Sequence, residues 1–210
     1  GGEDGTIQEL LDTLRIPYGG SGPQASALAF NKLNAKRQFE RAGIPTPSYE
    51  VLSRETYQHA LDHLALPVFL KPLSEGSSID VHFVEHRRDL MTILERAFDS
   101  YESLLVEKAI VGKEVTVGIL GDEPLPVIEL RPREPFYNFR AKYTLGMTEY
   151  LIPAPLAPRV AERVQAVALA AHQTLGLRDV SRVDIMLNKD DQPFVLEANS
   201  IPGMTETSLL

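Results

Sequence analysis

RVDIMLNKDDQPFVLEAN, residues 182–199, contains two apolar runs on either side of a short polar turn. Short polar side chains tolerate the backbone angles of a tight loop, so we expect a β-hairpin with its turn centred on Asp190-Asp191. A hairpin that is symmetric about this pair places Asp184 opposite Glu197. This pairing sets which side chains share a face.

Alternation along the two strands predicts one apolar face and one mixed face. The apolar face, which we assign to the core, comprises Val183, Ile185, Leu187, Phe194, Leu196 and Ala198. The mixed face comprises Arg182, Asp184, Met186, Val195, Glu197 and Asn199. Opposed Cβ atoms on such a face lie about 5 Å apart, and magnesium prefers oxygen ligands. The mixed face is therefore either a metal site or a solvated strand face with a surface ion pair.

The composition restricts the classes of function. The chain has 210 residues, of which 43% are hydrophobic and 24% are charged, as in ordinary soluble globular proteins. A formal net charge of -8 argues against a nucleic-acid partner but permits a nucleotide substrate. The chain lacks cysteine, which excludes disulfides and thiolate chemistry. Without a signal peptide or a long apolar run, we expect a cytoplasmic protein with no membrane partner.

Hydrophobic periodicity predicts an α+β fold with antiparallel sheets. Helices are expected at 6–14, 23–30, 32–42, 56–64, 88–100 and 159–175. Strands are expected at 48–52, 66–72, 81–85, 104–108, 114–120 and 125–131 and in the hairpin. The segment 132–158 is rich in proline and aromatic residues and lacks periodicity, as is typical of a lid over a ligand.

A glycine–serine loop follows the strand that delivers Lys71 to its end. Gly76, Ser77 and Ser78 allow backbone amides to approach an anion closely, and the neighbouring lysine could hold nucleotide phosphates. A plain flexible turn is the alternative interpretation. The chain contains neither the G-x-x-x-x-G-K-[ST] motif nor a G-x-G-x-x-G motif.

Two further segments carry candidate ligand-binding groups. The strand end 107–110, EKAI, could contact adenine through backbone groups, and Glu114 could contact a ribose; an exposed strand end is the alternative. The segment 136–143, FYNFRAKY, combines aromatic residues with two cations outside any periodic pattern. It suggests a cover over a ligand in which Lys142 meets a terminal phosphate.

Seven motifs in this order resemble the signatures of D-alanine:D-alanine ligases, which belong to the ATP-grasp superfamily. The motifs are GEDG at 2–5, NKL at 31–33, LKP at 70–72 with EGSS at 75–78, EK at 107–108, FY to AKY at 136–143, RVD at 182–184 and LEANSIPGMT at 196–205. The resemblance covers essentially the whole chain. It implies an ATP-grasp fold in which two α+β lobes with antiparallel sheets enclose a nucleotide site.

The resemblance also implies the residues that bind cofactors. The ATP-binding set would be Lys32, Lys71, Ser77, Ser78, Glu107, Lys108, Ile110, Glu114, Phe136, Lys142 and Met186. Within this set the two serines and the lysines other than Lys108 would hold phosphates, and Glu114 would contact the ribose. Glu107, Lys108 and Ile110 would contact adenine, and Phe136 and Met186 would line its pocket. Two Mg²⁺ or Mn²⁺ ions would be held by Asp184, Glu197 and Asn199.

The same resemblance assigns groups to the substrates. The catalytic set would be Arg182 and the Gly203 amide, which stabilise the tetrahedral oxyanion, and Ser77 and Tyr143, which complete the substrate-side hydrogen bonds. Ser208 and the Leu209 amide would receive the carboxylate of the second D-alanine. The implied reaction joins two D-alanines through a D-alanyl phosphate and yields D-alanyl-D-alanine for peptidoglycan precursors, and thus for the cell wall and cell shape.

By this resemblance residues 1–22 are the remnant of an N-terminal substrate domain, 23–106 form the central lobe, and 107–210 form the C-terminal lobe with the metal and acceptor sites. The family's N-terminal domain supplies a glutamate that engages the first D-alanine, so this chain alone could be inactive. A homodimer is one assembly that the full-length protein could adopt.

Some positions depart from the family pattern. Asp80 stands where a glycine usually ends the glycine–serine loop, which would stiffen the loop and add a negative charge near phosphates. Phe139 and Arg140 replace a tyrosine and a glutamate, and Ser74 replaces a frequent arginine. The alternatives are a related ATP-grasp ligase, either a carboxylate–amine ligase with another acceptor amine or a depsipeptide ligase with a hydroxy acid, and a non-catalytic nucleotide-binding module.

Overall fold

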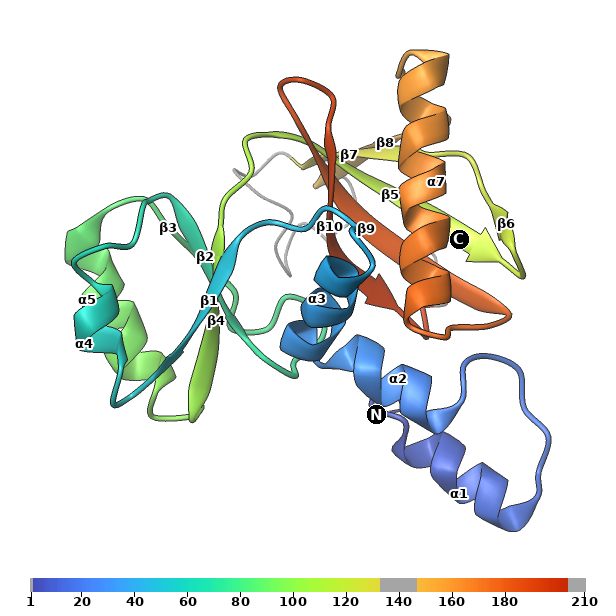
Figure 1. The fold of residues 1–210 in the computed structure, drawn as a ribbon, viewed down its shortest axis with the longest axis horizontal. Coiled ribbons are helices and arrows are strands. Elements are labelled where there is room, and N and C mark those ends of the chain that lie inside the picture. The colour runs from blue at the N-terminus through green and yellow to red at the C-terminus, as the bar shows by residue number, and fades with distance from the viewer. Residues whose placement is uncertain (1, 133–146, 204–210) are drawn as a thin grey trace. The chain divides into compact units, whose positions relative to one another are not determined.

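The computed structural model describes residues 2–132 and 147–203 and divides into two compact units (Figure 1). The larger unit comprises Gly1–Thr46 and Val111–Leu210, and the smaller unit comprises Pro47–Ile110. Both contain helices packed on antiparallel sheets, so the expected α+β class is confirmed. The division into segments 1–22, 23–106 and 107–210 stays a prediction about lobes. The contacts group residues 23–46 with the larger unit.

The larger unit is organised around a six-stranded sheet of order β10-β9-β5-β7-β8, with β6 paired to β5. Its strands are β5 (Gly112–Leu120), β6 (Glu123–Pro124), β7 (Ile128–Pro132), β8 (Thr148–Leu151), β9 (Val180–Asn188) and β10 (Pro193–Asn199). Its helices are α1 (Thr6–Leu14), α2 (Pro23–Phe30), α3 (Lys32–Arg41) and α7 (Pro158–Thr174).

The core of the larger unit lies between α7 and the sheet, and α7 runs along β5, β9 and β10 (Figure 1). Alternate residues of the strands point to the helix, among them Val115, Val117, Val183 and Ile185, all fully buried. The opposite face of the same strands is therefore free to carry polar groups. This arrangement positions the candidate site.

The hairpin of β9 and β10 confirms the expected pairing of Asp184 with Glu197 but contains a β-bulge. Near the turn Ile185 pairs with Val195, and the register shifts between Val195 and Glu197. The extra residue reverses the alternation, because a bulge sets two residues against one. The assignment of Val195 to the mixed face was therefore wrong: Val195 is fully buried in the core.

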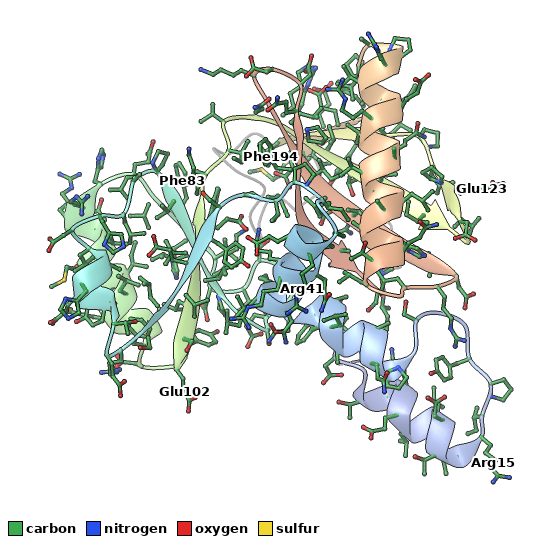
Figure 2. All side chains as sticks on the ribbon, in the orientation of Figure 1. Arg15, Arg41, Phe83, Glu102, Glu123 and Phe194 are labelled. Atoms are coloured by element: carbon green, nitrogen blue, oxygen red, sulfur yellow. The ribbon has the colours of Figure 1, made fainter. Side chains whose placement is uncertain are left out.

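The same bulge also shows that the assignment of Phe194 and Leu196 to the core face was wrong. Phe194, labelled in Figure 2, was placed on the core face, but it pairs with Met186, which lies on the mixed face, and it is only half-buried. Leu196, also assigned to the core, lies at the bulge and is half-buried.

The smaller unit contains a four-stranded antiparallel sheet of order β1-β4-β2-β3. Its strands are β1 (Tyr49–Ser53), β2 (Val68–Pro72), β3 (His82–Val84) and β4 (Ser103–Lys108), and its helices are α4 (Tyr57–Ala60) and α5 (Arg87–Ala97). Leu90 and Leu94 of α5 pack onto Leu70 and Val106 of the sheet. The expected helix at 56–64 is shorter, a single helical turn followed by a hydrogen-bonded turn at 61–63.

Within residues 2–132 and 147–203, no helix is both long enough and apolar enough to span a bilayer.

Candidate functional site

The sheet register of the larger unit gathers several predicted residues on one face. Asp184 of β9 pairs with Glu197 of β10, and Arg182 pairs with Asn199. Met186 of β9 pairs with Glu114 of β5. Because side chains at i and i+2 of a strand share a face, these three rows lie on the same side of the sheet. The structure therefore brings together Arg182, Asp184, Met186, Glu114, Glu197 and Asn199.

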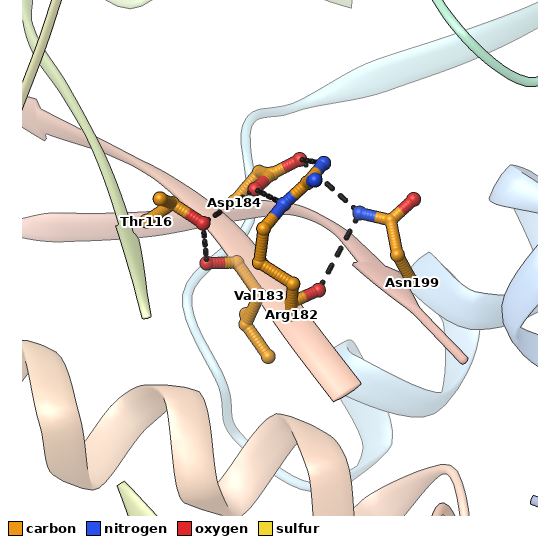
Figure 3. A network of polar contacts seen from close by, with 5 residues as sticks. All are labelled: Thr116, Arg182, Val183, Asp184 and Asn199. Carbon is orange, nitrogen blue, oxygen red and sulfur yellow. Dashed lines mark hydrogen bonds and ion pairs between the residues drawn. The ribbon is translucent and has the colours of Figure 1, made fainter. Parts of the chain in front are cut away.

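Asp184 is the centre of a hydrogen-bond network on this face (Figure 3). Arg182 donates from Nε to Oδ1 over 2.9 Å and from Nη2 to Oδ2 over 2.8 Å. Thr116 Oγ1 lies 2.7 Å from Oδ1, and Asn199 Nδ2 lies 3.2 Å from Oδ2. The two parallel bonds from the guanidinium are the strong, orientation-fixing geometry for this pair. Asp184 is only 8% exposed, and its carboxylate is thus held in one orientation.

The oxygen-bearing side chains on this face are of the type that a hard cation binds. Asn199 Nδ2 also donates to the Arg182 carbonyl at 3.4 Å, so the amide oxygen points away from Asp184 (Figure 3). Within residues 2–132 and 147–203 no group of three or more His, Cys, Asp or Glu side chains is placed to hold a metal ion. Both Asp184 oxygens accept hydrogen bonds in this structure, so Asp184, Glu197 and Asn199 stay predicted metal ligands. Mg²⁺ is usually held by one or two carboxylates together with substrate phosphates and water, which is the chemistry that these three side chains offer.

The smaller unit contains a second ion pair. Lys71 Nζ lies 2.5 Å from Glu107 Oε1, and the two side chains are 12% and 1% exposed. Phe69 lies directly opposite Glu107 across the strands, and Lys71 Nζ is 5.4 Å from its ring centroid. The lysine, predicted to hold phosphates, is thus positioned by a carboxylate that was assigned to adenine. A lysine fixed by a buried glutamate is also found in kinase nucleotide sites.

The strand end 107–110 was predicted to contact adenine through backbone groups. The amide of Lys108 donates to Ser48 O over 2.9 Å, and that of Ala109 donates to Pro67 O over 3.1 Å. These two amides are engaged inside the smaller unit. The groups of this segment that could then contact adenine are Ile110, which is half-buried, and the backbone carbonyl oxygens.

The glycine–serine loop after β2 adopts an unusual backbone. Ser77, Ser78 and Asp80 have φ values of 55°, 58° and 53°, in the left-handed region. Each such non-glycine residue costs about 1 kcal/mol or more, and such strain clusters at ligand-binding segments. Two backbone bonds, from Ile79 N to Gly76 O and from Val81 N to Ser78 O, close the loop into consecutive turns. The Asp80 carboxylate accepts a hydrogen bond from Tyr101.

The other predicted residues are placed as follows. Lys32 is half-buried at the start of α3, where the Asn31 side chain caps the helix by accepting from Asn34 N at 3.0 Å. Gly203 is exposed and follows the buried Pro202. The predicted residues that lie outside the described residues are Phe136, Lys142, Tyr143, Ser208 and Leu209, together with the departures Phe139 and Arg140.

Sequence reasoning missed three polar residues. Thr116 bonds Asp184, and its position two residues after Glu114 in a strand was the signal that could have found it. Tyr101 had no signal, because its partner Asp80 is remote in sequence. Lys36 is 1% exposed and donates to Thr46 Oγ1 over 2.6 Å, which in turn donates to Val195 O over 2.8 Å.

Comparison with known proteins gives a consistent result. The family model described as "D-ala D-ala ligase C-terminus" matches residues 38–210. D-alanine–D-alanine ligase of Trichlorobacter lovleyi is 44% identical over 210 residues, covering 100% of this chain and 67% of the relative. The corresponding protein of Pelobacter propionicus is 45% identical over 211 residues, covering 100% of this chain and 68% of the relative.

Solved structures agree. D-alanine–D-alanine ligase from Bacillus anthracis superposes with a TM-score of 0.87 at 36% identity, covering 99% of this chain and 68% of that one. The same enzyme complexed with ATP gives 0.83 at 33% identity, covering 100% and 67%. VanG D-Ala:D-Ser ligase from Enterococcus faecalis gives 0.86 at 32% identity, covering 99% and 62%. The chain therefore belongs to the D-alanine–D-alanine ligase family, a family of ATP-dependent ligases, and has their ATP-grasp fold.

Proposed function

We propose that this chain provides the nucleotide-binding, metal-binding and oxyanion-stabilising part of an ATP-dependent ligase that joins two D-alanines. The observation that carries the proposal is the Asp184-centred face, where two carboxylates, an amide and an arginine converge on one side of the hairpin. The family relationship supplies the chemistry, because relatives over 40% identical along the whole chain are D-alanine–D-alanine ligases.

The first half-reaction transfers the γ-phosphoryl group of ATP to the carboxylate of one D-alanine and releases ADP. Negative charge grows on the transferring group, so positive groups accelerate this step. Lys71, fixed by Glu107, and Lys32 are the described lysines proposed to bind phosphates, and Ser77 and Ser78 are proposed to contribute loop groups. Lys142 remains a proposed partner of the transferred phosphate.

Magnesium is proposed to be held by Asp184, Glu197 and Asn199. When bound, it would neutralise phosphate charge and orient the phosphates for transfer. Arg182 and Thr116 would keep the Asp184 carboxylate in a fixed orientation, as their hydrogen bonds do in this structure. Such supporting hydrogen bonds normally set ligand orientation at metal sites.

The second half-reaction forms the peptide bond. The amine of the second D-alanine attacks the acyl carbon of the D-alanyl phosphate, and the tetrahedral intermediate expels inorganic phosphate. Arg182 and the Gly203 amide are proposed to stabilise its oxyanion, a contribution of about 3 kcal/mol per donor in comparable sites. Ser77 and Tyr143 are proposed to complete the substrate hydrogen bonds. Ser208 and the Leu209 amide are proposed to bind the carboxylate of the second D-alanine.

Adenosine recognition completes the proposal. Glu114 is proposed to bind the ribose, and Met186 and Phe136 to line the base pocket. Glu107, Lys108 and Ile110 are proposed to contact adenine. The product, D-alanyl-D-alanine, would serve peptidoglycan precursor synthesis in the cytoplasm, and a homodimer is proposed for the full-length protein.

ADP release by the full-length protein tests this function, because the chain covers 67% of the length of a relative such as the Trichlorobacter lovleyi enzyme. Release that depends on D-alanine, with D-alanyl-D-alanine identified by mass spectrometry, is the expected result. L-alanine should not replace D-alanine. Absence of release with every acceptor would contradict the proposal and favour a non-catalytic nucleotide-binding module.

A second acceptor is worth including, because a D-Ala:D-Ser ligase has a TM-score of 0.86 to this chain. D-serine or D-lactate added with limiting D-alanine would reveal a related ligase with a different acceptor amine or a hydroxy acid. A mixed product that exceeds D-alanyl-D-alanine would assign the chain to that alternative.

A further inference from the structure

The loop from Gly76 to Asp80 ends in a residue that the proposed function does not use. Asp80 is exposed and adopts a φ of 53°, although aspartate enters the left-handed region less readily than glycine. A carboxylate at this position would also repel phosphates bound by Ser77 and Ser78 in the same loop. A hydrogen bond to the Asp80 carboxylate would hold the loop backbone in this conformation and would also weaken the repulsion between that carboxylate and the phosphates.

Tyr101 supplies such a contact. It lies between α5 and β4, and its ring packs against the apolar core of the smaller unit. Its hydroxyl donates to Asp80 Oδ2 over 2.5 Å. The hydrogen bond to Asp80, followed by burial and by the charges of Asp80 and Glu75, raises the pKa of Tyr101 to about 12. The hydroxyl therefore stays protonated and available as a donor at physiological pH.

We propose that Tyr101 is a positioning residue for the nucleotide: through its hydrogen bond to Asp80 it holds the loop 76–80 ready for phosphates and engages the carboxylate that would otherwise oppose them. This inference rests on the proposed role of the loop in ATP binding. It assigns Tyr101 no contact with ATP itself. Its effect should therefore appear in nucleotide affinity and depend on Asp80.

A first experiment follows the contact without using activity. Hydrogen–deuterium exchange across residues 75–81 is compared in wild type and Tyr101→Phe, which removes one oxygen and keeps the ring. The control is Tyr57→Phe, since the Tyr57 ring packs in the same core, with its centroid 5.4 Å from that of Phe98. Faster exchange is expected in Tyr101→Phe alone.

A second experiment measures KM for ATP and kcat in the full-length protein as a double-mutant cycle. Tyr101→Phe should raise KM for ATP about fivefold, as expected for one charge-assisted hydrogen bond near the surface, with kcat within about twofold. In the Asp80→Gly background, where the loop needs no support, the same substitution should change KM by less than about twofold. Tyr57→Phe should leave both constants unchanged.

The inference is overturned if Tyr101→Phe leaves exchange and KM as in wild type, or if it raises KM equally in the wild-type and Asp80→Gly backgrounds. If the proposed function itself is wrong, the result differs, because wild type would then show no ADP release dependent on D-alanine. In that event the affinity for a non-hydrolysable ATP analogue, measured by calorimetry, replaces KM in the same cycle.

Discussion

Each unit of the molecule contains an ion pair on its sheet whose side chains are largely buried, and the two pairs differ in what surrounds them. Arg182 and Asp184 lie two residues apart on one strand, and Thr116 and Asn199 add two further hydrogen bonds to the carboxylate. Lys71 and Glu107 lie on neighbouring strands and contact one another diagonally, with the glutamate almost fully buried.

The carboxylates of Asp184 and Glu107 differ in the role that we propose for them. Asp184 accepts hydrogen bonds from Arg182, Thr116 and Asn199 on a face that also contains Glu197. Glu107 lies at 1% exposure and mainly fixes Lys71. Asp184 is thus proposed to contact the metal, whereas the Glu107 side chain is proposed to position Lys71, which leaves the proposed adenine contact of Glu107 to its backbone. Substitution of Asp184 should therefore lower activity while the fold is retained, whereas substitution of Lys71 should lower both activity and stability.

The largest expected effect is on Asp184. Asp184→Ala should lower D-alanine-dependent ADP release in the full-length protein by at least about 100-fold, because a metal ligand is lost. Glu197→Ala should behave similarly, and circular dichroism should show the fold retained in both. The matched control is Asp190→Ala in the exposed turn of the same hairpin, which should keep activity. Near-normal activity of either site variant would remove the metal assignment.

The second effect tests the smaller unit. Lys71→Met leaves Glu107 buried without its lysine, so thermal or urea denaturation should show a loss of about 3 kcal/mol as well as a loss of activity. Lys71→Met combined with Glu107→Leu should recover most of the stability, since an apolar pair can replace a buried ion pair. Activity should stay low in the double variant. Recovery of both would mean that Lys71 has no role beyond folding.

The third effect concerns the bulge that positions the Asp184 face. Val195 is fully buried and paired with Ile185, whereas Leu196 is half-buried at the bulge. Val195→Ala should cost about 2 kcal/mol in urea denaturation, in the range of large-to-small core substitutions. Leu196→Ala should cost less. The reverse order would indicate the unbulged register.

The smallest expected effect is a pH dependence of stability that arises in the larger unit. His172 of α7 is buried with Nδ1 2.7 Å from Ser181 Oγ, and burial lowers its pKa below the ordinary value, partly offset by the charge of Asp122. The unfolded chain then binds a proton more readily than the folded one. Stability should fall as pH drops from about 6.5 towards the lower folded pKa.

Hydrogen exchange resolves this pH effect by region. Protection of α7 and β9 should decrease in that window, while the four-stranded sheet should be less affected. His172→Gln should flatten the dependence in α7, whereas His59→Gln, at an exposed position in the smaller unit, should not. An unchanged pH profile in His172→Gln would rule out this residue as the cause.

Local pattern predicted much of the fold. The helical spacing of residues 6–14 and 159–175 and the turn at Asp190-Asp191 were sufficient to place α1, α7 and the hairpin. The bulge was not predictable, because Phe194, Val195 and Leu196 are all apolar and alternation cannot distinguish their faces. The Asp184–Glu197 pair was predicted from a symmetric turn, and it forms because the bulge shifts the register beyond Val195.

The candidate site was predictable where it depends on one strand pair and not where it depends on distant segments. Arg182, Asp184 and Glu197 share a hairpin, so their proximity followed from sequence. Lys71 and Glu107 meet only because β2 pairs with β4, two strands separated by β3 and α5. Likewise no local pattern joins Asp80 to Tyr101, and Asp80 was expected to present its charge to phosphates, although Tyr101 engages that carboxylate.

Binding of Mn²⁺ in the presence of a non-hydrolysable ATP analogue, followed by electron paramagnetic resonance, tests the central claim most directly, since it needs no turnover. Wild type, Asp184→Asn and Asp190→Asn are compared in the full-length protein. We expect nucleotide-dependent Mn²⁺ binding in wild type and Asp190→Asn, and affinity at least about tenfold weaker in Asp184→Asn. Equal Mn²⁺ affinity in all three proteins would contradict the assignment of the hairpin face as the metal site.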